Sequence, residues 1–262
     1  MAWKTVPIGE HFTFHTWEEG EGTPLLYLHG FEGHPGDSEF LRRLAGARRI
    51  IAPELPGYGE STGFEHIEET LDMTLALRQF VESLGVPNVD VIGHSLGGMF
   101  AGEIAAICPH VVNRLLLVSP FGLWIDEAPT PDPFVLNPTQ LAEITWHNPA
   151  AATSIATSRA LSNGEDQVAA TLARTANLSV AGKFLWPIPD RGLRKRLPLV
   201  RAKTLIVRGT SDELIPAVYA EQFADLVPGA SVITIDAAGH YPMHEAPDEF
   251  LRTCEAFLME PR

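Results

Sequence analysis

The stretch Val91–Phe100, VIGHSLGGMF, places glycines two residues before and two residues after a single serine, Ser95. It begins in the apolar run at 89–92 and continues into a helical pattern. A sharp strand-to-helix turn leaves room only for small side chains at those two flanking positions. The spacing G-x-S-x-G therefore predicts a strained turn that lifts the Ser95 hydroxyl above the end of a strand. The N–H groups of the following helix would face the same place, which favours a developing negative charge.

Short apolar runs and helical patterns alternate through most of the chain. Strands are predicted at residues 11–17, 25–29, 50–53, 89–92, 114–119, 204–209 and 231–236, and helices at 65–84, 96–107, 216–226 and 247–258. Strands that alternate with helices favour a mostly parallel sheet with helices on both faces. The predicted fold class is therefore α/β.

The alternation is interrupted between residues 121 and 197. This segment is rich in proline at its start and continues with helical patterns but with no strong strand pattern. It is too long for an ordinary loop. We interpret it as a mainly helical cap inserted in a core formed by residues 1–120 and 198–262. Three of the five tryptophans lie in it (Trp124, Trp146 and Trp186), and we expect most of them to form the interior of the cap.

A serine hydroxyl becomes a good nucleophile when a base takes its proton, and the base needs an acid to orient it. Asp212 directly follows the predicted strand at 204–209, and His240 follows the strand at 231–236 in a glycine-flanked loop. Alone, Asp212 could be a helix N-cap and His240 a solvated loop residue. Together, the order Ser95, Asp212, His240 at successive strand ends predicts a catalytic triad.

Two backbone N–H groups are predicted to hold the negative oxygen that forms when Ser95 attacks a carbonyl group. One belongs to Leu96, which follows the serine, and the other to Phe31, in the loop after an early strand. Asp126 and Glu127 follow another strand and are a fallback for the acid, but Asp212 lies closer to its strand end.

Five stretches of the chain resemble the α/β-hydrolase superfamily. They are LHGFEG (28–33), IIAPELPGYGEST (50–62), VIGHSLGG (91–98), TLIVRGTSDELIP (204–216) and AGHYPMHEAPDEF (238–250). The resemblance implies the α/β-hydrolase fold with a helical lid, as in carboxylesterases and in the carbon–carbon hydrolases of aromatic ring-cleavage pathways. The sequence departs from the family pattern at Glu54, where aspartate is usual. The resemblance implies that the residue at this position supports a loop near the active site.

The resemblance also bears on the reaction. A serine at position 95 disfavours haloalkane dehalogenases and epoxide hydrolases, which use a nucleophilic aspartate there. The loop after Gly30 lacks the run of glycines typical of carbon–carbon hydrolases. We therefore expect a serine hydrolase acting on small to medium apolar carboxylic esters. The alternatives are a carbon–carbon hydrolase with the same triad, an amidase, lactonase or thioesterase, and a ligand-binding receptor without enzymatic activity.

Composition and charge limit the classes of molecule that we expect the protein to bind. The net charge of −14 repels phosphate backbones and anionic lipid surfaces, so we expect neither a nucleic acid nor a membrane partner. The basic segment 191–203 is interpreted as a solvated segment that connects the cap to the core. The expected partner is a small-molecule ester, and a homo-oligomer is left open.

No cofactor or metal is expected, because the glycine-containing loops match no phosphate-binding pattern. His240 and His244 have the spacing of a zinc pair, but Pro242 between them disfavours a continuous helix. His94 is expected to be structural and to point away from the Ser95 hydroxyl. The two cysteines, Cys108 and Cys254, are expected to be free buried thiols. No apolar run is long enough for a secretory signal or a membrane span, so a reduced, cytoplasmic location is expected.

Overall fold

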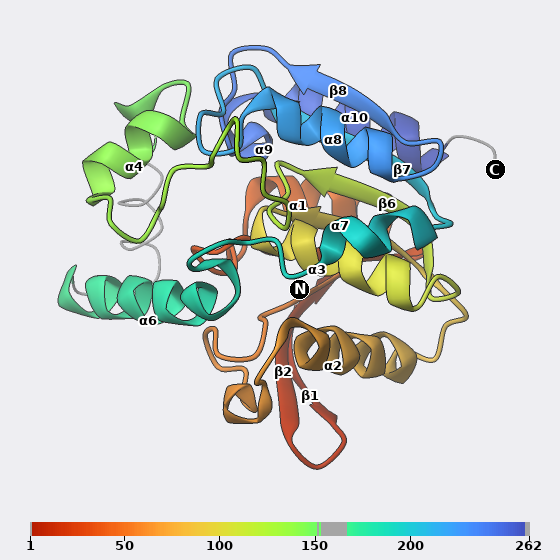
Figure 1. Cartoon of the computed structure of the whole chain (residues 1–262). Helices are drawn as coiled ribbons and strands as arrows, with labels where there is room; N and C mark the ends of the chain where they lie inside the picture. Colours follow the sequence, from red (N-terminus) through yellow and green to blue (C-terminus); the bar gives the residue numbers. More distant parts are fainter. Residues whose placement is uncertain (1, 151, 153–166, 260–262) are drawn as a thin grey trace.

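The computed structural model describes residues 2–150, 152 and 167–259. Its centre is an eight-stranded sheet with the strand order β1-β2-β4-β3-β5-β6-β7-β8. Figure 1 shows the sheet among its covering helices. The strands are β1 Ala2–Ile8, β2 Phe12–Glu19, β3 Pro24–Leu28, β4 Arg49–Pro53, β5 Val89–His94, β6 Val112–Val118, β7 Lys203–Gly209 and β8 Ser231–Ile235. Strand β2 pairs antiparallel with β1 and β4, and the other pairs are parallel. The predicted α/β class with a mostly parallel sheet is confirmed.

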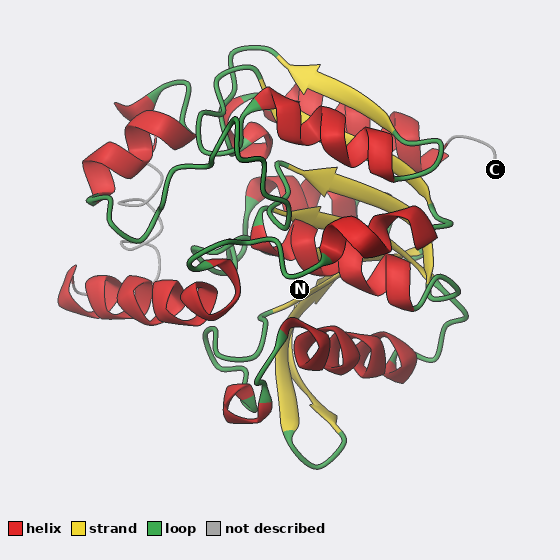
Figure 2. Cartoon of the chain, in the orientation of Figure 1, coloured by secondary structure: helices red, strands yellow, loops and turns green. Residues whose placement is uncertain are grey.

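Helices cover both faces of the sheet (Figure 2). One face packs on α2 (Thr70–Ser83), α3 (Leu96–Ile107) and α8 (Ala217–Leu226), and the other on α1 (Glu39–Ala45) and α10 (Pro247–Met259). The strands supply both cores because successive side chains point to opposite faces. In β3, Leu26 and Leu28 join the first core while Leu25 and Tyr27 join the second.

Several elements differ from the sequence predictions. Strand β1 and helix α1 were not expected, and the helix predicted at 65–84 is divided. A short 3₁₀ turn, η1 (Phe64–His66), precedes α2, which begins at Thr70. The side chains of Glu69 and Asp72 cap the first turn of α2 reciprocally, which fixes the start of this helix.

The segment between β6 and β7 contains α4 (Pro138–Thr145), α6 (Gln167–Leu185), α7 (Leu193–Arg196) and η2 (Leu197–Leu199). Figure 1 shows α4 and α6 beside the sheet and its covering helices, whereas α7 lies against α3. The guanidinium of Arg196 in α7 donates to both oxygens of the buried Glu103 carboxylate at 2.5 and 2.6 Å. The division into a cap at 121–197 and a core stays a prediction.

The structure also bears on the tryptophans and on membrane insertion. Trp186 is 58% exposed, so the expected apolar interior does not include it, whereas Trp124 and Trp146 are partly buried. In the described ranges, no helix combines the length and the apolar character that crossing a membrane requires.

Candidate active site

Ser95 occupies a strained turn between β5 and α3. Its backbone angles are φ 56° and ψ −117°, so the predicted turn is confirmed. The flanking glycines are required by close approach, because a Cβ on Gly97 would lie 2.2 Å from the carbonyl oxygen of Leu28. A Cβ on Gly93 would lie 2.5 Å from the carbonyl oxygen of Gly97. The motif therefore brings the serine directly over the end of the neighbouring strand β3.

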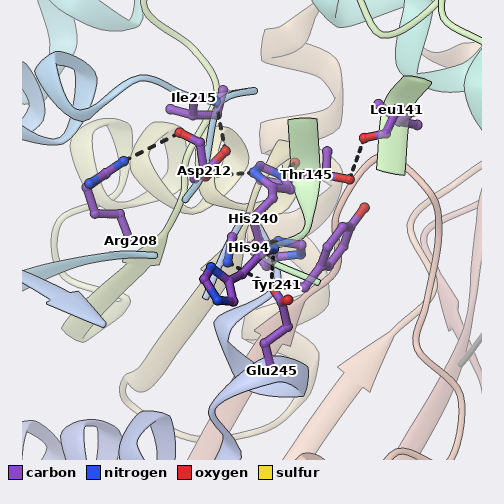
Figure 3. Close-up of polar contacts among 12 residues, drawn as sticks. His94, Leu141, Thr145, Arg208, Asp212, Ile215, His240, Tyr241 and Glu245 are labelled. Carbon is purple, nitrogen blue, oxygen red and sulfur yellow. Dashed lines mark hydrogen bonds and ion pairs between the residues drawn. The ribbon is translucent and has the colours of Figure 1, made fainter. Parts of the chain in front are cut away.

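The structure brings the three predicted triad residues into one chain of hydrogen bonds. His240 Nε2 lies 2.8 Å from Ser95 Oγ, and His240 Nδ1 lies 3.0 Å from Asp212 Oδ2. The second carboxylate oxygen of Asp212 accepts the backbone N–H of Ile215 at 2.9 Å (Figure 3). With Nδ1 protonated toward the carboxylate, Nε2 is free to accept the serine proton. The fallback acids, Asp126 and Glu127, are exposed, and Asp126 instead accepts the indole N–H of Trp124.

The loop after β3 lies against the serine. A Cβ on Gly30 would fall 3.1 Å from the Ser95 Cβ, so Phe31 directly follows a residue in contact with the nucleophile. The Tyr58 hydroxyl donates to the carbonyl oxygen of Phe31 at 3.2 Å. Phe31 thus lies in the loop next to Ser95, and Leu96 begins α3 directly after Ser95. The assignment of both N–H groups to an oxyanion hole stays a prediction.

Glu54, the departure from the family pattern, lies under the loop that carries Tyr58. Its Oε2 accepts the backbone N–H of Glu60 at 2.8 Å and lies 3.1 Å from His15 Nδ1. A Cβ on Gly59 would fall 2.0 Å from Glu54 Oε1. The longer acid is thus accommodated beneath a glycine, and it keeps the loop-supporting role that the sequence suggested.

His94 contacts the main chain of the predicted base. Its Nε2 lies 2.9 Å from the carbonyl oxygen of His240, and the two ring centroids are 4.9 Å apart. Burial, and to a smaller extent the neighbouring His240, lowers the pKa of His94 well below its ordinary value. His94 is therefore neutral, and its Nε2–H donates to the His240 carbonyl. It contacts the main chain of His240 rather than the Ser95 hydroxyl, as expected.

Sequence reasoning missed two contacts that hold the triad loops. The end of α4 lies between these loops: the Ile144 carbonyl accepts the N–H groups of Glu213 and Leu214, and the Thr145 carbonyl accepts that of His240 at 2.6 Å. The second contact is Glu245, whose Oε2 accepts the N–H of Gly239 at 2.7 Å. No spacing in the sequence identifies these partners, because they are fixed by tertiary packing alone. Figure 3 shows Thr145, His240 and Glu245 around the site.

A cavity of about 380 Å³ adjoins the triad. It is lined by the chain neighbours of the site residues, among them Gly30, His94 and Tyr241. Ser95 and His240 themselves are 0% exposed, so a substrate reaches them only when the groups that cover them move. Part of the wall is apolar and comes from α4 and from Trp146, whose ring stacks on Tyr241 with centroids 4.9 Å apart.

The structure also locates the residues weighed for metal and thiol chemistry. Within residues 2–150, 152 and 167–259, no three histidine, cysteine or acidic side chains are arranged to hold a metal ion. His244 lies on the short helix α9 (Pro242–Glu245), and both ring nitrogens of His240 already have partners. Cys108 and Cys254 are free and buried, as predicted.

Comparison with known proteins places these features in a family. The sequence model of the alpha/beta hydrolase family matches residues 25–253. The chain is 27% identical to 2-hydroxymuconate semialdehyde hydrolase of Pseudomonas putida, over 93% of this chain and 89% of that protein. It is 26% identical to Lipase 1 of Psychrobacter immobilis, over 90% of this chain and 77% of the lipase. An esterase from Exiguobacterium antarcticum superposes with a TM-score of 0.79 at 19% identity, covering 99% of this chain and all (100%) of the esterase.

Proposed function

The chain belongs to the alpha/beta hydrolase family, and we propose that the protein is a serine hydrolase that cleaves small to medium apolar carboxylic esters. The observation that carries this proposal is the continuous hydrogen-bond chain from Ser95 Oγ through His240 to Asp212. A strained turn at Ser95 supports it, because backbone strain of this kind is concentrated at reactive residues.

The proposed reaction has two acyl-transfer steps. His240 Nε2 takes the Ser95 proton as Oγ attacks the ester carbonyl, and the backbone N–H groups of Phe31 and Leu96 hold the resulting oxyanion. His240 then gives its proton to the departing alcohol, leaving an acyl group on Ser95. In the second step His240 takes a proton from water, which releases the acid. Asp212 holds the imidazole in the required tautomer and stabilises its charged form.

The ester preference rests on the cavity. Its volume of about 380 Å³ is at the small end of the range for ligand sites in proteins. Leu141, Ala142, Trp146 and Met243 give it an apolar wall that suits a short acyl chain. A carboxylic ester of small to medium size is the simplest substrate that satisfies both the wall and the proposed nucleophile.

A carbon–carbon hydrolase is the second candidate. Similar proteins include 2-hydroxy-6-oxo-6-phenylhexa-2,4-dienoate hydrolase of Burkholderia cepacia, 24% identical over 97% of this chain. A dienoate is an anion, and the cavity of this chain carries the carboxylate of Glu32. The guanidinium of Arg174 lines the same cavity and pairs with Glu32, so the cavity offers a dienoate no uncompensated positive charge, and we rank ester hydrolysis first.

The test is hydrolysis of p-nitrophenyl esters from acetate to decanoate by the wild type and by Ser95→Ala. Loss of a triad serine typically lowers turnover by about a millionfold, so the variant should be inactive. Ser83→Ala, at an exposed position at the end of α2, is the matched control and should retain full activity. Absence of wild-type turnover would refute the ester proposal. Cleavage of a ring-fission dienoate, or tight ligand binding without turnover, would then favour the second candidate or a receptor.

A further inference from the structure

The cavity beside Ser95 contains a pair of opposite charges. Glu32 lies in the loop after β3, and Arg174 lies on α6. Arg174 Nε is 3.7 Å from Glu32 Oε1, and the two side chains are 31% and 38% exposed. Both line the same cavity as His94 and Tyr241. A molecule bound next to the serine therefore meets a carboxylate and a guanidinium together.

Glu32 is fixed in the cavity wall by two further contacts. The Tyr241 hydroxyl donates to Glu32 Oε2 at 2.7 Å, and the side-chain amide of Asn177 on α6 donates to the Glu32 main-chain oxygen at 2.7 Å. Burial, with a smaller contribution from the charge of Glu32, raises the pKa of Tyr241 well above its ordinary value, so the hydroxyl remains a donor. The carboxylate is thus held at the cavity and is not free to turn into solvent.

Arg174 keeps an unused donor at the same place. Its Nη2 is buried and makes no hydrogen bond within the part of the chain that the structure describes. The separation of 3.7 Å from Glu32 is an ion-pair distance but too long for a good hydrogen bond. Glu32 therefore neutralises the guanidinium without occupying its donors. If the charge of Glu32 were removed, Arg174 would be a cation ready to bind an anion.

We propose that Glu32 is a specificity-determining residue that makes the cavity select uncharged acyl chains over chains ending in a carboxylate. This deepens the proposed ester hydrolysis and rests on it. A substrate carboxylate in the cavity would lie close to the Glu32 charge in a partly dehydrated space, where repulsion lowers affinity on the order of tenfold or more. Arg174 offsets part of that repulsion, so removing either charge should shift the preference, and the two shifts should be opposite in direction.

The test compares two esters with the same leaving group and a five-carbon acyl chain, p-nitrophenyl pentanoate and mono-p-nitrophenyl glutarate. They differ only in ending in a methyl group or a carboxylate. The ratio of their kcat/KM values therefore cancels any change in the triad or the oxyanion donors. We expect the wild type to prefer pentanoate. Glu32→Gln keeps the size of the side chain and an acceptor for Tyr241, and should shift the ratio toward glutarate by about tenfold or more.

Two further variants make the comparison specific. Arg174→Gln should shift the ratio in the opposite direction, because it leaves Glu32 without its counter-charge. Glu10→Gln, at an exposed position in the β1–β2 turn, changes the net charge equally and should leave the ratio unchanged. An unchanged ratio in Glu32→Gln would overturn the inference while leaving ester hydrolysis intact. If thermal unfolding shows that Glu32→Gln does not fold, the direction of the Arg174→Gln shift decides.

A binding measurement separates this inference from the proposed function. If the wild type hydrolyses neither ester, the ester proposal fails, and ligand-observed NMR with pentanoate and pentanamide then tests the charge selection without turnover. Glu32→Gln should gain affinity for pentanoate relative to pentanamide by the same factor. Equal relative affinities in the wild type and the variant would overturn the inference.

Discussion

The backbone strain at Ser95 is held by the strand next to it. The N–H of Ser95 donates to the Val118 carbonyl at 2.9 Å, and the Ser95 carbonyl accepts the N–H of Phe121 at 3.1 Å. A non-glycine residue in such a conformation costs on the order of 1–3 kcal/mol. Because both main-chain groups of the residue are bonded to β6 and the residues that follow it, the turn cannot relax without breaking these hydrogen bonds at the carboxyl end of β6.

At Asp212, replacement by asparagine should nearly abolish turnover while preserving the fold. An amide N–H in place of carboxylate Oδ2 would favour the tautomer with the proton on Nε2, so His240 could no longer accept the Ser95 proton. We expect kcat on the best p-nitrophenyl ester to fall by about 10⁴-fold. The exposed neighbour Glu213, changed to glutamine, is the control and should behave as the wild type. A fall of less than tenfold would mean that Asp212 serves only packing.

At His94, stability should depend on pH. The folded protein keeps His94 neutral because its pKa lies well below 6.5, whereas the unfolded chain binds a proton there as the pH falls below about 6.5. The stabilisation is therefore complete above pH 6.5 and is lost progressively below it. Between pH 6.5 and 5, the free energy of unfolding should fall more steeply in the wild type than in His94→Asn. The difference in slope should approach about 1.4 kcal/mol per pH unit.

Urea unfolding between pH 5.0 and 7.5 measures this difference. Asparagine does not titrate, and the loss of the hydrogen bond from Nε2 to the His240 carbonyl lowers stability at every pH, so comparing slopes isolates the titration of His94. His110→Asn, at an exposed position, is the control and should give the slope of the wild type. Parallel slopes for the wild type and His94→Asn would show that His94 does not couple folding to pH.

At the scale of the elements, the sequence predicts those that are buried and periodic. The helix expected at 96–107 is α3, Leu96–Ile107, because the glycine-flanked serine marks its start. Strand β1 was missed because it is an edge strand whose residues 3–5 are exposed, so no alternation of burial marks it. The helix expected at 65–84 starts at Thr70 because side-chain capping by Glu69 and Asp72 outweighs the apolar spacing that included Ile67.

An added methyl group should destabilise the protein far more at the start of α3 than at the end of α6. In Gly97→Ala, the Cβ would lie 2.2 Å from the Leu28 carbonyl oxygen and 2.5 Å from that of His29, and neither backbone atom can move away without disturbing β3. We expect a loss of about 3 kcal/mol or more, or failure to fold. In Gly182→Ala, the nearest atom, in Phe134, is 3.9 Å away, so the higher helix propensity of alanine should stabilise the protein by up to about 1 kcal/mol. Urea unfolding measures both, and similar effects at the two positions would contradict the close approach at Gly97.

At the scale of the whole molecule, the site is assembled from the ends of β3, β5, β7 and β8 and from the end of α4. The sequence predicts the residues at the strand ends because the carboxyl ends of parallel strands meet at one edge of a sheet. Ser95, Asp212 and His240 were found in this way. Glu32, Thr145 and Glu245 were not found in this way. Their partners lie across the junction between the sheet and the helical segment, and strand register does not determine how that segment packs on the sheet. The sequence therefore locates the proposed triad residues better than the residues that hold their loops or shape the cavity.

Glu245 links the histidine loop to the helical segment between β6 and β7. Its Oε2 accepts the N–H of Gly239, the residue before His240, and its Oε1 accepts the N–H of Asn148, just beyond α4, at 3.0 Å. One carboxylate thus holds both the histidine loop and the chain leaving α4. If it is removed, the backbone bond from His240 to Thr145 and the stacking of Trp146 on Tyr241 remain between them.

Glu245→Ala should therefore loosen the junction and lower turnover without unfolding the sheet. Amide hydrogen exchange at Gly239 and Asn148 should accelerate by about tenfold or more, because each N–H loses its acceptor, while amides of β5 and β6 should exchange as in the wild type. We expect kcat to fall by about tenfold with a smaller change in KM, since His240 is displaced more than the cavity wall. Glu249→Ala, at an exposed position on α10, should change neither quantity. Faster exchange with unchanged kcat would show that the α4 carbonyls alone fix His240; unchanged exchange would show that Glu245 does not hold the junction.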